Sequence, residues 1–148
     1  MALLPTNRGI KRRALAKFVF FRLTIFVEDE SMGILGIMLT DGPWQTERWE
    51  TVTKIAEAAL DKGHEVKMFL FLDGVYNPIK HQNFPDFTDQ PVDSFKRCAE
   101  KGAVIVTCGI CTNARGLQDG KDYIENIKSA GLPDYSEFLG DADSVITF

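Results

Sequence analysis

Residues 64–72 are apolar on both of the faces that a β-strand presents. Alternate side chains of a strand point to opposite faces. One face would carry Val66, Met68, Leu70 and Leu72, and the other Phe69 and Phe71. A strand with two apolar faces must be covered on both sides, which is typical of a parallel sheet between two layers of helices. This segment constrains the fold class more than any other.

The rest of the chain alternates expected strands with expected helices. Short apolar runs predict strands at 33–40, 64–72, 103–107 and 143–148. Helical spacing predicts helices at 46–60 and 91–101, shorter helical segments at 112–118 and 121–130, a further helical turn at 135–139, and a long loop from Asp73 to Gln90. This order predicts an α/β protein, a single-domain three-layer α/β/α sandwich with a mainly parallel sheet.

The charge distribution separates residues 1–31 from the rest. Six of the 17 basic and three of the 21 acidic residues lie there, which leaves 11 basic against 18 acidic residues in 32–148. We expect 1–31 to be an N-terminal extension outside the domain and 32–148 to be the domain. Lys17 and Arg22 interrupt the apolar run that a signal peptide would need.

The same numbers exclude two classes of partner. An acidic body is not the surface that binds nucleic acid directly. The expected domain also has no stretch of about 18 apolar residues, the length that a membrane-spanning helix needs. We therefore expect neither a nucleic-acid nor a membrane partner. Three cysteines cannot form a complete set of intramolecular disulfides, which favours reduced thiols in the cytoplasm.

The expected third strand ends on a cysteine, Cys108, followed by Gly109 and the start of a helix. The carboxyl edge of an open α/β sheet is where ligands bind. Backbone N–H groups at a helix start and the nearby Arg115 both favour thiolate over thiol. The position predicts a reactive cysteine, and the alternative is a buried structural one. Gly109 favours the first, because glycine permits close approach of the backbone.

Cys111 completes a CxxC spacing with Cys108. It is compatible with a thioredoxin-like disulfide pair, a resolving or second sulfur-carrying thiol, or a small residue packed under the first helical turn. Arg115 is either a partner for an anionic sulfur or acidic group, or a surface residue. Cys98 lies on an apolar helix face and is expected to fill the core. A zinc site would need two further ligands, which the scattered remaining cysteine and histidines do not supply.

Five segments in a fixed order carry a resemblance to a known family. They are the first strand with residues 40–43, residues 59–66, residues 69–77, the cysteine segment that ends in Arg115-Gly116, and residues 142–148. From Met32 to Phe148 the chain resembles the DsrE/DsrF-like sulfur-relay family (DsrEFH and TusD-like proteins). Residues 1–31 have no counterpart in that pattern.

The resemblance implies a role for each part of the site. A sulfur-carrying member bears a persulfide on the cysteine seven residues before the Arg-Gly pair, and here that cysteine is Cys108. Cys111 is not carried over from the TusD-like pattern. The resemblance also implies a homotrimer or hexamer with the cysteine near a subunit interface, and sulfur donor and acceptor proteins as partners. Because displacement at sulfur needs only a thiolate, access and a docking surface, we expect no organic or metal cofactor.

These observations predict a cytoplasmic sulfur carrier of the sulfurtransferase type. Cys108 would accept sulfane sulfur and relay it to a partner thiol. Two alternatives stay open: a CxxC thiol–disulfide oxidoreductase that uses Cys108 and Cys111, and a noncatalytic assembly subunit.

Overall fold

The computed structural model of the chain describes residues 32–84 and 89–148. The expected N-terminal extension, 1–31, lies outside them. The described residues form a parallel sheet with the strand order β4-β3-β2-β1-β5. The strands are β1 (Ile34–Leu39), β2 (Glu65–Leu70), β3 (Val104–Cys108), β4 (Lys128–Ala130) and β5 (Ser144–Thr147).

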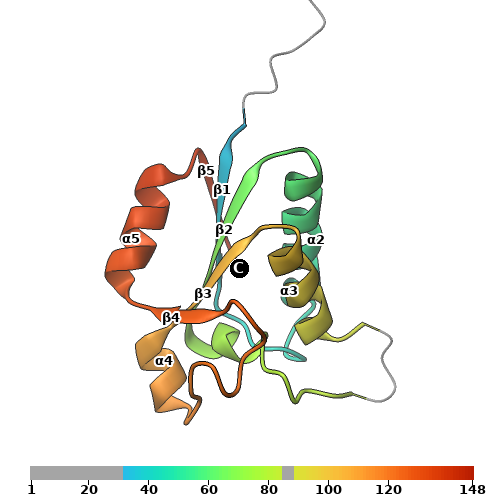
Figure 1. Cartoon of the computed structure of the whole chain (residues 1–148), viewed down its shortest axis with the longest axis vertical. Coiled ribbons are helices and arrows are strands. Elements are labelled where there is room, and N and C mark those ends of the chain that lie inside the picture. The colour runs from blue at the N-terminus through green and yellow to red at the C-terminus, as the bar shows by residue number, and fades with distance from the viewer. Residues whose placement is uncertain (1–31, 85–88) are drawn as a thin grey trace, which may run out of the picture. The chain divides into compact units, whose positions relative to one another are not determined.

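Helices cover both faces of this sheet. Figure 1 shows α2 (Arg48–Asp61) and α3 (Pro91–Glu100) on one side and α5 (Leu132–Asp141) on the other. The 3₁₀ helix η1 (Leu72–Tyr76) and the short helix α4 (Gly109–Ala114) follow β2 and β3 directly. The predicted three-layer α/β/α sandwich is therefore confirmed.

The two faces of β2 contribute to two different cores, as its alternating pattern predicts. Met68 and its neighbours on the same face pack into the core that also contains Val52 of α2 and Phe95 of α3. Phe69 belongs to the core on the opposite face, where its ring lies 4.8 Å from that of Tyr135 of α5. Full burial of such side chains stabilises the fold by about 1.5–3 kcal/mol each.

The C-terminal third of the chain differs from the prediction. No helix forms at 121–130. Tyr123 is instead buried in the core. Its hydroxyl forms a hydrogen bond with that of Thr112 (3.0 Å), and its backbone forms an isolated β-bridge with Ile79. Tertiary contacts, not a helical face, account for the apolar spacing there.

Three further boundaries in this part of the chain need correction. Lys128–Ala130 is an edge strand that pairs with β3, a strand that the helical pattern concealed. The segment predicted at 112–118 is α4, which begins earlier, at Gly109. The helical turn predicted at 135–139 is part of the ten-residue helix α5.

The end of β2 also differs from the prediction. The strand stops at Leu70, and Leu72, the last residue of the predicted strand, adopts a left-handed backbone conformation (φ +49°). It begins η1, which continues into the predicted loop. Gly74 of η1 donates its N–H to the carbonyl oxygen of Thr40 at 2.9 Å. A Cβ on Gly74 would lie 2.2 Å from the carbonyl oxygen of Leu39, so only glycine allows η1 to lie against the end of β1.

Gly74→Ala should therefore lower the free energy of unfolding by about 3 kcal/mol, at the upper end of the usual cost of overpacking. Urea denaturation followed by circular dichroism measures this loss. The matched control is Gly140→Ala in α5, where an added Cβ meets nothing within 4 Å. That variant should be neutral or slightly stabilising, because alanine favours a helix. Equal effects of the two substitutions would contradict the proposed contact.

Candidate functional site

Cys108 is held at the carboxyl edge of the sheet by its place as the last residue of β3. It pairs with Ala130 of β4 and also caps the N-terminus of α4. Its Sγ accepts a hydrogen bond from the backbone N–H of Cys111 at 3.4 Å. The side chain is largely covered, with the residue 3% exposed. The turn from β3 to α4 therefore fixes the position of the sulfur.

Cys111 lies beside Cys108, and the two are not joined by a disulfide. Burial raises the pKa of the Cys111 thiol, and a hydrogen bond with the Cys108 side chain raises it further. The backbone N–H of Leu72 and the charge of Arg115 act in the opposite direction. Leu72, the residue with the left-handed backbone conformation, thus directs its N–H to the sulfur of Cys111.

Arg115 links the end of α4 to η1. Its Nε and Nη2 donate to Oδ1 of Asp73 at 2.9 and 2.6 Å, and its Nη1 donates to the carbonyl oxygen of Cys111 at 3.1 Å. The guanidinium also lies 5.8 Å from the centre of the Tyr76 ring. The hydrogen bond from Arg115 holds the pKa of the Asp73 carboxyl below its usual range. The arginine therefore fixes the backbone around Cys111 and carries a cation next to the two thiols.

Two residues next to Cys108 have different surroundings. A Cβ on Gly109 would lie 3.6 Å from both the carbonyl oxygen of Ala130 and the Cβ of Ser129, which is ordinary contact. The expectation that Gly109 permits a close backbone approach is therefore wrong. Ile110 is 79% exposed, so an apolar side chain stands in solvent directly after the turn.

Cys98 is kept apart from the two site thiols. It lies in the core between α2 and α3, and its Sγ is 3.6 Å from the carbonyl oxygen of Thr53. Burial raises the pKa of this thiol to about 12. The prediction that Cys98 fills the core is confirmed.

The structure adds residues that the sequence did not single out. Asp73 and Tyr76 of η1 hold Arg115, and Gln45 forms a hydrogen bond with Asp73 while accepting the N–H of Gly42 at 3.0 Å. The loop that follows β1 therefore lies beside the cysteine site. The sequence contained a signal for these residues. Asp73 follows β2 and Asp41 follows β1, and the carboxyl ends of parallel strands meet at one edge of the sheet.

Residues 32–84 and 89–148 contain neither a candidate metal site nor a candidate membrane span. No group of three or more His, Cys, Asp or Glu side chains could hold a metal ion there. No helix in these ranges is both long and apolar enough to cross a membrane.

Comparison with known proteins agrees with this architecture. The model of the DsrE/DsrF-like family matches residues 34–148. This chain belongs to the DsrE/DsrF-like family. Two uncharacterized archaeal relatives match over most of their length. The protein of Methanopyrus kandleri is 35% identical over 80% of this chain and 97% of its own. The protein of Methanocaldococcus jannaschii is 38% identical over 76% of this chain and 96% of its own.

A more distant family member carries a functional name. The protein named "Putative sulfurtransferase DsrE" of Allochromatium vinosum is 27% identical over 76% of this chain and 95% of its own. Among solved structures, the YchN protein of Escherichia coli superposes with a TM-score of 0.73 at 20% identity. The match covers 79% of this chain and all of YchN. At that identity the likeness shows the fold alone.

Cys98 and Cys108 should differ in reactivity toward a small alkylating reagent. Iodoacetamide at neutral pH should modify Cys108 faster, because the pKa of about 12 keeps Cys98 protonated and its side chain is enclosed. Peptide mapping by mass spectrometry at timed intervals measures both rates. Comparable labelling of the two in the native protein, with both reacting faster after denaturation, would argue against a distinct site at Cys108.

Proposed function

We propose that the protein is a sulfur carrier that holds sulfane sulfur as a persulfide on Cys108 and relays it to a partner thiol. The observation that carries this proposal is the position of Cys108. It ends β3 at the carboxyl edge of the sheet, and its sulfur accepts an N–H. Family membership and the sulfurtransferase name of the Allochromatium relative support the same chemistry.

Loading is a displacement at sulfur. The Cys108 thiolate attacks the terminal sulfur of a donor persulfide, so a new S–S bond forms on Cys108 as the donor S–S bond breaks. The electron pair of the broken bond leaves with the donor thiolate, which then takes up a proton. Relay repeats this exchange, with the acceptor thiolate attacking the terminal sulfur on Cys108. Neither step needs an external oxidant, reductant or cofactor.

The environment of Cys111 favours storage of the loaded sulfur. Its raised pKa keeps this thiol protonated at neutral pH, so it is a poor nucleophile toward its neighbour. When deprotonated, it can attack the inner sulfur of the Cys108 persulfide. That attack forms a Cys108–Cys111 disulfide and releases hydrosulfide. Cys111 would thus act as a resolving thiol after Cys108 has been loaded.

A second candidate is a thiol–disulfide oxidoreductase. It rests on the contact between the Cys108 and Cys111 side chains and on their CxxC spacing. In this case the pair would form a disulfide by exchange with a disulfide of a partner, which would be reduced to two thiols, and no sulfur would be added. Mass spectrometry separates the two functions, because only the carrier gains the mass of a sulfur atom.

Single substitutions should divide the roles of the two thiols. Cys108→Ser should abolish persulfide loading from a small-molecule persulfide, because serine supplies no thiolate. Cys111→Ser should load normally and keep the persulfide longer, because the resolving thiol is gone. Intact-protein mass spectrometry over time gives both the extent and the lifetime of loading.

The matched control is Cys98→Ala, which removes the core thiol and should leave loading unchanged. If Cys108→Ser and Cys111→Ser lose loading equally while Cys98→Ala does not, the two thiols act as one redox unit and the oxidoreductase is favoured. If none of the three thiols gains sulfur and no Cys108–Cys111 disulfide forms, the noncatalytic assembly role is favoured.

The lifetime of the persulfide should also depend on pH through Cys111. Because the pKa of Cys111 is raised, its thiolate fraction grows only as the pH rises above neutral, and release should accelerate in the same direction. Between about pH 7 and about pH 9.5 the lifetime should shorten in the wild-type protein more than in Cys111→Ser. An identical pH dependence in the two proteins would show that Cys111 is not the releasing thiol.

We also propose that donor and acceptor proteins exchange sulfur at this edge, and that the chain forms a homotrimer or hexamer. The exposed apolar side chains of Leu72 and Ile110 lie in the two elements that carry the site, η1 and α4, and offer contact area for another protein surface.

A further inference from the structure

A cavity of about 440 Å³ lies at the start of α2, separate from the two thiols. It is called the tryptophan cavity below, and its walls include Trp44, Trp49, Glu47, Glu50 and Asp89. The size is within the range of small-molecule sites. Its lining combines aromatic rings with carboxylates.

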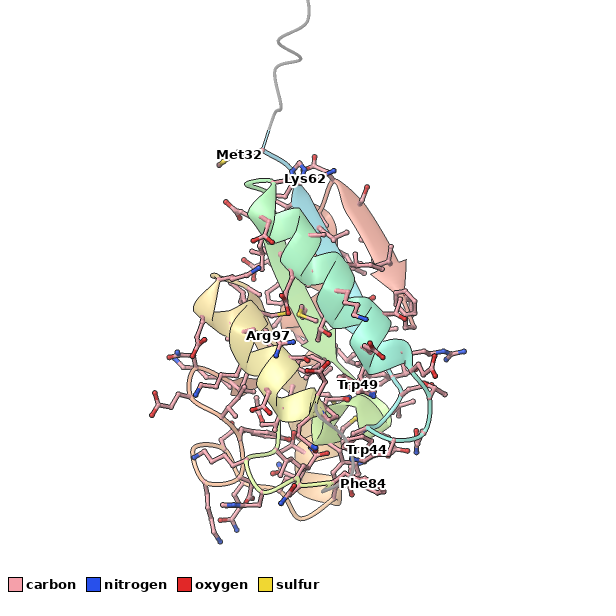
Figure 2. All side chains as sticks on the ribbon, turned by 90° about the vertical axis from the view of Figure 1, so that its right-hand side faces the viewer. Met32, Trp44, Trp49, Lys62, Phe84 and Arg97 are labelled. Atoms are coloured by element: carbon pink, nitrogen blue, oxygen red, sulfur yellow. The ribbon has the colours of Figure 1, made fainter. Side chains whose placement is uncertain are left out.

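The aromatic wall is built from rings that contact one another. The Trp44 ring lies 6.0 Å from that of Trp49 in an edge-to-face arrangement and 5.2 Å from that of Phe84. Figure 2 shows the three labelled side chains following one another at the lower end of α2. Trp49 is anchored in the core at 7% exposure, whereas Trp44 is 38% exposed. The core thus supports a ring that remains accessible.

The acidic side of the cavity carries more negative than positive charge. Glu47, Glu50 and Asp89 all act on the ammonium of Lys54, which forms an ion pair with Glu50. Arg48, the neighbouring cation on α2, is directed to Asp41 at 3.2 Å. Among the described residues, three carboxylates therefore act on this one ammonium group. Asp89 comes from a different segment than the two glutamates, so the N-terminus of α2 alone does not account for their convergence.

We propose that the tryptophan cavity binds an organic cation, a guanidinium or alkylammonium group on an apolar stem. An aromatic face attracts such a cation and covers its apolar stem, while carboxylates pair with the charge. A purely apolar ligand would leave the carboxylates facing it without compensation, and an anion would be repelled. The group can come from a free small molecule or from an arginine or lysine side chain of a polypeptide.

The cavity is also connected to the cysteine site. Gln45 belongs to its lining and forms a hydrogen bond with Asp73, the carboxylate that holds Arg115. A cation bound in the cavity would therefore lie next to the loop that supports the sulfur chemistry. The proposal does not depend on that chemistry, because it rests on the rings and charges of the cavity alone.

Tryptophan fluorescence tests the proposal directly, because the only two tryptophans of the sequence, Trp44 and Trp49, both line the cavity. The protein is titrated with N-acetylarginine amide and, in parallel, with N-acetylcitrulline amide, a neutral molecule of nearly the same shape. The arginine compound should give a saturable change, with binding about tenfold tighter than that of the citrulline compound. Butylguanidinium and an arginine-containing blocked pentapeptide then distinguish a free cation from a polypeptide side chain as the source.

Two sets of variants make the test specific. Glu47→Gln combined with Asp89→Asn should weaken binding of the arginine compound about tenfold, since both side chains are exposed and their loss should not unfold the protein. Glu137→Gln on α5 is the control and should bind like the wild-type protein. Trp44→Leu should also weaken binding, with Trp49 left as the reporter. The proposal is overturned if the neutral compound binds equally well, if no saturable change occurs, or if the acidic variants bind unchanged.

Discussion

The parallel pairing of β2 with β3 is the constraint on which the candidate site depends. Its register sets Leu70 opposite Thr107, so both strands end at one edge of the sheet. The chain leaves β2 through η1 and β3 through α4, and these two short helices therefore lie side by side. Only then does Asp73 of η1 meet Arg115, the residue that follows α4, at 2.6 Å, and only then does the N–H of Leu72 face the sulfur of Cys111.

The proposed sulfur carrier would need both shielding of the loaded sulfur and access for a partner. Cys108 and Cys111 are 3% and 6% exposed, so a persulfide formed there would be shielded from bulk solvent and from other thiols. The edge position and the exposed Ile110 keep the turn itself on the surface. In the proposed function, contact of a partner protein with this edge would bring its thiol or persulfide to Cys108. The internal Arg115–Asp73 pair leaves the geometry of the turn independent of the partner.

Much of this arrangement could be predicted from the sequence. The doubly apolar pattern of residues 64–72 determines a covered parallel strand, and the apolar run that ends at Cys108 determines a thiol at the sheet edge. Both patterns arise from local periodicity and burial, and the family resemblance agrees with them. The core role of Cys98 follows from the same reasoning, because it lies on the apolar face of a helix.

The remaining features depend on contacts between distant segments. Lys128–Ala130 is too short to show a strand pattern, and it pairs only because β3 offers a free edge. The carboxylate that pairs with Arg115 is Asp73, 42 residues away, and this link requires the folded sheet. The convergence of Asp89 with Glu47 in the tryptophan cavity likewise joins two segments that local sequence does not relate.

A crystal structure of the protein after incubation with a small-molecule persulfide tests the central claim most directly. The account predicts density for one additional sulfur atom on Sγ of Cys108, with the Arg115–Asp73 pair and the hydrogen bond from the Cys111 N–H still in place. Additional sulfur on Cys111 or Cys98 with Cys108 unmodified, or three cysteines that all remain without additional sulfur and without a disulfide, would contradict it.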